Sequence, residues 1–170
     1  MARLRKPRLA AEQAAVVDES AVSSSQFRLL IDTNILLDVL LAREPWAEDA
    51  VQLLDLVGRG EVQGFVASHA ITTVFYIVER ERDRRVALTA VSDLLSIAAI
   101  VSIGAADLHR AMTIGLKDFE DAVHAAACLQ VGGQFLVTRN GKDYRGAPVE
   151  TRTAGEILAL LSGGSSSGPR

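Results

Sequence analysis

Short apolar runs alternate with longer segments of helical periodicity along most of this sequence, and that alternation most constrains how the chain can fold. Apolar runs of strand length predict five strands, at residues 27–31, 62–67, 100–103, 135–137 and 149–151. Segments whose apolar residues recur at helical spacing predict seven helices, at residues 34–41, 46–57, 68–78, 84–97, 105–114, 118–131 and 154–161. Strands that alternate with helices form a parallel sheet with helices on both faces. The expected fold class is therefore α/β, with a mostly parallel sheet of four to five strands.

The predicted elements divide the chain into three parts. Residues 27–161 form the expected domain, and the 170-residue chain, 49% hydrophobic, has enough apolar material for one sizeable core. Residues 1–26 lack a buried-strand pattern and are expected to be flexible or partly helical. Residues 162–170 consist mainly of Ser and Gly, which is typical of a flexible tail.

Composition also indicates where the chain works. Cys128 is the only cysteine, which excludes an intramolecular disulfide and a cysteine-rich zinc site and suits a reducing compartment. The longest apolar stretches are far shorter than the ~18 residues of a membrane span. The basic N-terminus has no apolar segment behind it and does not resemble a secretory signal. We therefore expect a soluble, cytoplasmic protein with no membrane partner.

Charge is distributed unevenly along the sequence. The formal net charge is −3, but residues 1–9 carry four basic and no acidic side chains, which leaves 14 basic against 21 acidic side chains elsewhere. The basic end can contact nucleic-acid phosphates, although a solvated terminus can have the same composition. An acidic body needs cations before a polyanion can approach its acids.

Polar side chains follow two predicted strands directly. Asp32 comes after the strand at 27–31, and Asn140 and Asp143 lie in the turn after the strand at 135–137. Taken singly, Asp32 is also a suitable helix N-cap, and Asn-Gly is a common turn dipeptide. In parallel sheets, ligands bind beyond the carboxyl ends of the strands, so these residues are candidates for a binding site.

The start of the helix at 118–131 supplies further carboxylates. Asp118 and Asp121 are three residues apart and share one helix face. An ordinary explanation is again available, with Asp118 as N-cap and Asp121 as a first-turn acid favoured by the helix dipole. The small residues Ala122 and Ala125 would let this helix lie close to the sheet and bring Asp121 toward the strand ends.

These acids define a chemistry if they meet at one edge of the sheet. Neighbouring carboxylates repel one another unless they are protonated or bind cations. Oxygen ligands without cysteine suit hard cations, so the expected cofactor is Mg²⁺ or Mn²⁺. Such ions activate water and neutralise a phosphodiester. The sequence therefore favours in-line hydrolysis of a phosphodiester.

Three segments, in this order, resemble the PIN-domain family: residues 30–34 (LIDTN), 118–122 (DFEDA) and 137–144 (VTRNGKDY). The resemblance covers residues 27–161 and implies a Rossmann-like, three-layer fold with an acidic pocket that binds Mg²⁺ or Mn²⁺ and cleaves single-stranded or structured RNA. The Asp-Phe-Glu-Asp pattern is similar to that of VapC-like toxin ribonucleases. That similarity implies a toxin–antitoxin pair, with an antitoxin protein as partner and a homodimeric toxin.

The resemblance also assigns residues by position. Four acids match metal-binding and catalytic positions of the family: Asp32, Asp118, Asp121 and Asp143. Asn140 falls where many members have Asp, and with the flanking Arg139 and Lys142 it is expected to contact substrate phosphates.

One departure from the family affects the site. Many members carry a Glu in the helix after the second strand, whereas residues 68–74 hold no acid. Glu79 and Glu81 come more than a turn too late to replace it. Either Asp118 or Glu120 compensates, or the metal is bound more weakly.

Three functions are therefore compared. The leading hypothesis is a Mg²⁺- or Mn²⁺-dependent endoribonuclease, and the alternative is a non-catalytic RNA-binding or regulatory module, which the missing acid favours. A phosphoryl-transfer domain, such as a receiver or haloacid-dehalogenase-like domain, also places Asp at a strand end. The segment after Asp32 lacks the second Asp of the phosphatase Asp-x-Asp motif, which weighs against this third class.

Two histidines lie close to these motifs in the sequence. His69 follows the strand at 62–67, and His124 comes three residues after Asp121. A neutral imidazole is a poor ligand for Mg²⁺. We therefore expect a capping or surface role for His69 and a solvated or core-edge role for His124.

Overall fold

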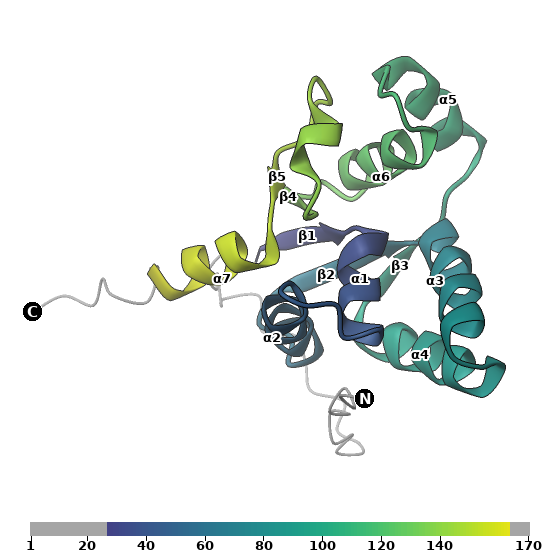
Figure 1. Ribbon diagram of the computed structural model, residues 1–170. Helices are drawn as coiled ribbons and strands as arrows, with labels where there is room; N and C mark the ends of the chain where they lie inside the picture. The colour runs from purple at the N-terminus through teal and green to yellow at the C-terminus, as the bar shows by residue number, and fades with distance from the viewer. Residues whose placement is uncertain (1–26, 164–170) are drawn as a thin grey trace, which may run out of the picture.

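Five parallel strands form the centre of the molecule, in the order β3-β2-β1-β4-β5 (Figure 1). The strands are β1 (Arg28–Ile31), β2 (Gln63–Ala67), β3 (Ala99–Val101), β4 (Phe135–Val137) and β5 (Thr151–Arg152). Every neighbouring pair is parallel, which confirms the predicted α/β class and strand number. The structure is a computed structural model that describes residues 27–163, so the predictions for residues 1–26 and 164–170 lie outside the described residues.

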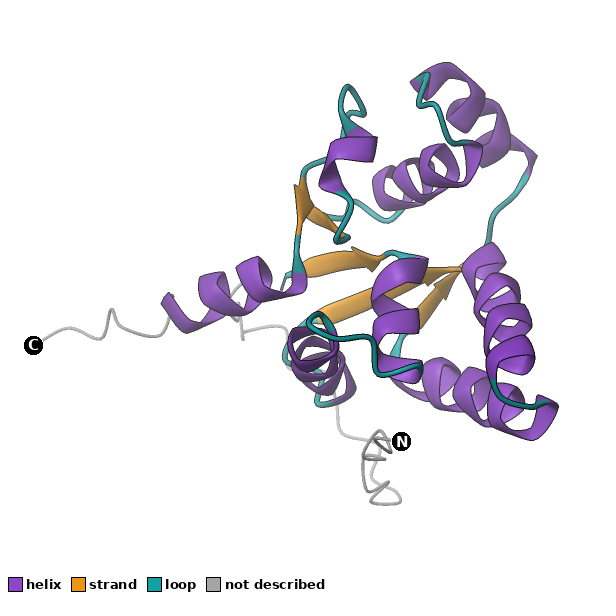
Figure 2. Cartoon of the chain, viewed as in Figure 1, coloured by secondary structure: helices purple, strands orange, loops and turns teal. Residues whose placement is uncertain are grey.

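Helices cover both faces of this sheet, which gives three layers (Figures 1 and 2). One face carries α1 (Thr33–Leu40), α2 (Ala47–Gly58), α3 (Ser68–Glu81), α4 (Arg84–Ile97) and α7 (Ala154–Gly163). The other face carries α6 (Phe119–Gln130) and the short 3-10 helix η1 (Gly141–Tyr144), and α5 (Ala105–Ile114) packs against α6. Within this described part of the chain, no helix is long and apolar enough to cross a membrane.

The central strand β1 shows why the sheet is buried on both sides. Leu29 and Ile31 belong to the larger core beneath α1 to α4, whereas Leu30 belongs to the core beneath α6. All three side chains are 0% exposed. Successive side chains of a strand point to opposite faces, so a strand covered on both faces needs a continuous apolar run.

Most element ends agree with the sequence prediction to within one residue, and four elements differ by more than that. Helix α3 runs to Glu81 rather than residue 78, β3 covers Ala99–Val101 rather than 100–103, and β5 lies at Thr151–Arg152 rather than 149–151. Ser162 and Gly163, predicted to belong to the tail, are the last residues of α7. These are shifts of two or three residues at element ends, where a local pattern is least informative.

By residue type, Ser68 is predicted to be the N-cap of the helix at 68–78, and this prediction is wrong. The N-cap position of α3 is Ala67, and Ser68 is the first residue of the helix. Its hydroxyl oxygen instead accepts a hydrogen bond from the Ile103 backbone N–H at 3.3 Å, which ties α3 to the segment after β3. A long-range partner therefore takes the hydroxyl that the sequence assigned to a local cap.

The strand order locates the crevice in which the sheet can bind a ligand. From β1 the chain moves outward through β2 to β3, then crosses back to β4 on the opposite side of β1. The order reverses between β1 and β4, and ligands of such sheets bind at the carboxyl ends of the strands at this point. Asp32 and Thr138 are the first residues beyond these two strand ends.

Candidate metal centre

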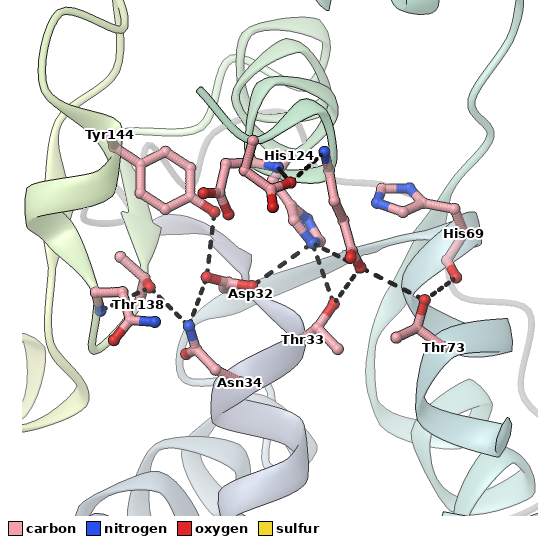
Figure 3. A network of polar contacts seen from close by, with 12 residues as sticks. Asp32, Thr33, Asn34, His69, Thr73, His124, Thr138 and Tyr144 are labelled. Atoms are coloured by element: carbon pink, nitrogen blue, oxygen red, sulfur yellow. Dashed lines mark hydrogen bonds and ion pairs between the residues drawn. The ribbon is translucent and has the colours of Figure 1, made fainter. Parts of the chain in front are cut away.

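Asp32 is held at the switch point by backbone and side-chain hydrogen bonds. Its backbone N–H donates to the Val137 carbonyl at 3.0 Å, so pairing with β4 fixes the position of Asp32 at the end of β1. Its Oδ2 accepts from the Asn34 side-chain amide at 2.7 Å and from the Tyr144 hydroxyl at 3.1 Å (Figure 3). Asp32 occupies the N-cap position of α1 but makes no side-chain capping bond, so its carboxylate serves the pocket and not the helix.

Asn34 connects the first helix with the turn after β4. Besides Asp32, its amide donates to the hydroxyl oxygen of Thr138 at 2.9 Å, and its Oδ1 accepts from the Arg139 backbone N–H at 3.4 Å. Two segments that are far apart in the sequence, residues 32–34 and 138–139, are therefore joined by one side chain. This arrangement restricts the orientation of the Asp32 carboxylate.

Asp121 and Asp32 meet at the hydroxyl of Tyr144, which donates to Oδ2 of Asp32 and also interacts with the Asp121 carboxylate. Burial, together with the charges of Asp32 and Asp118, raises the pKa of Asp121 to about 6, although the bond from Tyr144 opposes this shift. Burial and the two carboxylates also raise the pKa of Tyr144 above its ordinary range, so the phenol stays protonated as a donor. Predicted metal ligands from two distant segments are thus brought together.

Asp118 and Asp143 lie at the rim of the same pocket. Both are exposed, and the charge of each contributes to the raised pKa of Asp121. Asp118 caps α6, because its Oδ1 accepts from the backbone N–H groups of Glu120 at 2.8 Å and Asp121 at 3.4 Å. The capping explanation therefore holds for Asp118, whereas it fails for Asp32.

The three residues expected to contact substrate differ in how accessible they are. Arg139 donates from Nη1 to Oδ1 of the buried Asp38 at 2.8 Å, and its guanidinium lies 4.4 Å from the centre of the Trp46 ring. These contacts give Arg139 a structural role that the sequence did not indicate. Asn140 and Lys142 are exposed on the turn after β4.

Glu120 reaches across the pocket from α6 to the helix that follows β2. Its Oε1 accepts from the hydroxyls of Thr73 at 3.4 Å and Thr33 at 3.5 Å. Thr73 lies on α3, the helix in which the resemblance led us to look for an acid. The carboxylate of Glu120 therefore occupies the region of α3 that carries no acid of its own.

His69 and His124 lie beside Asp32 and Glu120, and neither has the surface or solvated role expected from the sequence. His124 is 1% exposed, and its Nε2 lies 3.1 Å from the Thr33 hydroxyl oxygen and 3.5 Å from Oδ1 of Asp32. The rings of His69 and His124 are 4.7 Å apart between centres. Burial lowers the pKa of both imidazoles and so favours their neutral form, although the negative charge of Asp32 acts in the opposite direction.

Potential metal ligands therefore fall into two adjoining groups. Asp32 and Asp121 form the acidic pocket, with Asp118 and Asp143 at its rim. Within residues 27–163, the group of histidine and acidic side chains close enough to share one ion consists of His69, Glu120 and His124, whose ligand atoms all lie within 4.8 Å of one another. The one sequence signal for this second group was the four-residue spacing of Glu120 and His124, which places them on one helix face.

Residues 28–142 match a family model described as the PIN domain. Ribonuclease VapC1 of Aquifex aeolicus (strain VF5) is 23% identical over 135 residues, which cover 76% of this chain and 92% of the relative.

Two solved structures share the fold. A toxin–antitoxin complex from Klebsiella pneumoniae is 24% identical, with a TM-score of 0.57 over 74% of this chain and 97% of that one. VapC20 of Mycobacterium tuberculosis, a toxin that cleaves the sarcin–ricin loop, is 17% identical, with a TM-score of 0.59 over 71% of this chain and 95% of that one. At these identities the two structures establish the architecture alone.

Proposed function

Because this chain belongs to the PIN-domain family, we propose that it is a Mg²⁺- or Mn²⁺-dependent endoribonuclease that hydrolyses RNA phosphodiester bonds. One observation carries the proposal: Asp32 and Asp121 converge on the Tyr144 hydroxyl where the strand order reverses. The raised pKa of Asp121 shows that its ionised form is unfavourable when buried beside other carboxylates. A divalent cation bound between the acids would reduce this repulsion. The similar protein from Aquifex aeolicus is itself named a ribonuclease.

The side chains of the acidic pocket fit a hard divalent ion. Asp32 offers Oδ1, since its Oδ2 already accepts two hydrogen bonds, and Asp121 offers its carboxylate. We propose Glu120 as the substitute for the acid missing from α3, because Asp118 is engaged as a helix cap whereas Glu120 reaches Thr73. Asp118 and Asp143 are proposed to add negative charge at the rim, which attracts divalent cations to the place where the RNA backbone enters.

The catalytic roles of the protein groups follow from this arrangement. A bound ion would supply positive charge that activates water and neutralises the phosphate. Asn34 and Tyr144 hold Asp32 in one orientation, so the ligand geometry exists before the substrate arrives. Above a pH of about 6, Asp121 is ionised and available as a ligand.

Substrate contacts are proposed for the exposed side chains of the turn after β4. Lys142 carries a solvated positive charge near the acidic rim, and Asn140 offers both a donor and an acceptor. Phosphate contacts of this kind position the RNA without selecting its sequence. Arg139 is left out of this role because Asp38 and Trp46 engage its guanidinium.

We further propose that the chain is the toxin of a toxin–antitoxin pair. The support is structural similarity, since one similar solved structure is described as a toxin and another as a toxin–antitoxin complex. An antitoxin protein would then be the regulatory partner, and the toxin would form a homodimer. Cellular RNA as the substrate would place this activity in the cytoplasm.

An RNA-cleavage assay with the full chain tests the proposed activity. A mixed single-stranded RNA pool is incubated with Mg²⁺, Mn²⁺ or EDTA, using wild type and Asp32→Asn, with folding checked by circular dichroism. Cleavage by wild type in metal, and its loss in EDTA and in the variant, is expected. RNA binding without cleavage in every metal would instead support the non-catalytic module, for which the acid-free start of α3 is the motivating observation.

A further inference from the structure

We propose that His69, His124 and Glu120 form a second metal site, which takes a transition ion of the Zn²⁺ class and adjoins the acidic pocket. The three side chains come from the first turn of α3 and from the first half of α6. This proposal goes beyond the ribonuclease function and does not require it, because it concerns metal binding alone.

The spacing of the three side chains suits one shared ion. Their ligand atoms all lie within 4.8 Å of one another, and Oε1 of Glu120 is 4.0 Å from Nε2 of His124. Ligands about 2.1 Å from a tetrahedral ion are about 3.4 Å apart. A small closure achieves that distance, and Glu120, with 43% of its side chain exposed, has the freedom to make it.

The imidazole nitrogens are in an unusual state for buried polar atoms. Both ring nitrogens of His69 and Nδ1 of His124 are shielded from solvent, and none has a hydrogen-bond partner in the described part of the chain. Buried polar atoms of native proteins nearly always have partners, and an ion is one accepted explanation when they do not. Nε2 of His124, the ring nitrogen that faces Glu120, already has the Thr33 hydroxyl oxygen at 3.1 Å, so the unpartnered nitrogens of His69 are the ones that point to an ion here.

The donor set determines which ion fits. Two imidazoles and one carboxylate with an open fourth position form a catalytic-type Zn²⁺ site, whereas Mg²⁺ prefers six oxygen ligands. Affinity for nitrogen-containing sites rises along the series from Mn²⁺ to Cu²⁺, so Zn²⁺, Co²⁺ and Ni²⁺ should bind more tightly than Mg²⁺. The second site therefore differs in its donor set from the all-oxygen pocket of Asp32 and Asp121, although the two sites would share the Glu120 carboxylate.

Asp32 connects the two sites. Its Oδ1 lies 3.5 Å from Nε2 of His124, and its Oδ2 is bound by Asn34 and Tyr144 on the side of Asp121. The Thr33 hydroxyl lies within hydrogen-bonding distance of His124 and donates to Glu120, which orients both side chains. An ion held by the histidines would thus have Oδ1 of Asp32 as a nearby additional oxygen ligand.

Direct metal titration of the full chain tests this site without RNA. Co²⁺ serves as the optical probe, because a tetrahedral, nitrogen-containing site gives much stronger visible absorption than an octahedral oxygen site, and Zn²⁺ affinity is measured by calorimetry. Wild type is expected to bind Co²⁺ with the strong spectrum and to release it to Zn²⁺. His69→Ala and Glu120→Gln should each weaken Zn²⁺ binding on the order of 100-fold.

Two further variants make the result specific. His109→Ala is the matched control, because His109 is exposed on α5 and belongs to no such ligand group among residues 27–163. Asp121→Asn should keep the strong Co²⁺ spectrum, which separates this site from the acidic pocket.

Equal Zn²⁺ affinity in wild type and Glu120→Gln, or a weak octahedral spectrum in wild type, would overturn the proposal. If His69→Ala does not fold, Glu120→Gln decides alone. Since no step uses RNA, failure here and failure of the ribonuclease assay are distinguishable.

Discussion

The hydroxyl of Tyr144 donates a hydrogen bond to Oδ2 of Asp32 at 3.1 Å, across 112 positions of sequence. This bond connects η1 with the end of the central strand, and the same hydroxyl interacts with Asp121. The phenol is 3% exposed, so water does not compete for it. The relative placement of the two central acids therefore depends on one buried donor.

Replacing this donor should weaken the site more than the fold. Tyr144→Phe keeps the ring that packs against the sheet and removes only the hydroxyl. We expect Mn²⁺ affinity to fall about 10-fold to 100-fold, as for other groups that orient metal ligands, and stability to fall by about 1–2 kcal/mol. Calorimetric Mn²⁺ titration and chemical denaturation measure the two effects. Wild-type Mn²⁺ affinity in the variant would show that Tyr144 does not orient the acids.

The raised pKa of Asp121 predicts a pH-dependent stability in metal-free protein. The folded-state pKa is about 6 against an ordinary value of 3.8, so the folded state favours the protonated acid. Its stabilising contribution is complete below a pH of about 4 and is lost as pH rises through about 6. Asp121→Asn should therefore be more stable than wild type at pH 7.5, by at most about 3 kcal/mol, and similar to it at pH 4.

Thermal unfolding in EDTA across this pH range measures the difference between the two proteins. Saturating Mn²⁺ should reverse the order at pH 7.5, because the ion stabilises wild type and binds the variant less well. A constant difference in Tm from pH 4 to pH 7.5 would contradict the assignment of the shift to Asp121.

Arg139 should contribute to stability, through Asp38. Asp38 is 0% exposed, and its Oδ2 has no hydrogen-bond partner among the residues described, so the ion pair with Arg139 is its main compensation. Arg139→Ala leaves that carboxylate buried without its partner and should cost about 3 kcal/mol. Urea denaturation measures this cost, and adding Asp38→Leu should restore most of it. An Arg139→Ala protein as stable as wild type would contradict the structural role.

Lys142 offers the matching test on the substrate side. Its side chain is exposed and makes no salt bridge among the described residues, so Lys142→Ala should leave the free energy of unfolding unchanged within about 0.5 kcal/mol. Loss of one phosphate contact should raise KM for RNA several-fold and reduce its dependence on salt. Steady-state cleavage at two salt concentrations tests this expectation. An unchanged KM would remove Lys142 from the proposed RNA path.

The fold could be predicted from the sequence because its strands are buried on both faces. A strand such as 135–137 is then a continuous apolar run between turn residues, and its position needs no knowledge of its partners. The predicted position of the edge strand β5 was less accurate, because a two-residue strand at the border of the sheet leaves little local pattern. The boundary errors therefore concentrate where packing, not periodicity, decides.

The site could be predicted only to the extent that parallel topology places strand ends together. Parallel topology predicts that Asp32 lies at the site with Asp121 near it. It does not distinguish an Asp that caps a helix from one that can bind a ligand. Asp32 and Asp118 occupy the same position relative to their helices, and only the direction of each side chain distinguishes them. His124 was assigned to solvent or the core edge because no local pattern reveals that α6 buries this face. The pairing of Arg139 with Asp38 spans 101 positions and has no local signature.

RNA cleavage by the acidic pocket is tested most directly by comparing wild type with a variant that lacks one of its two central acids. Wild type and Asp121→Asn are incubated with single-stranded RNA and Mn²⁺ at pH 7.5, after circular dichroism has shown both to be folded. We expect endonucleolytic cleavage by wild type, suppressed by EDTA, and a loss of activity of at least about 100-fold in the variant. Equal cleavage by both proteins, or intact RNA with a wild type that binds Mn²⁺, would contradict it.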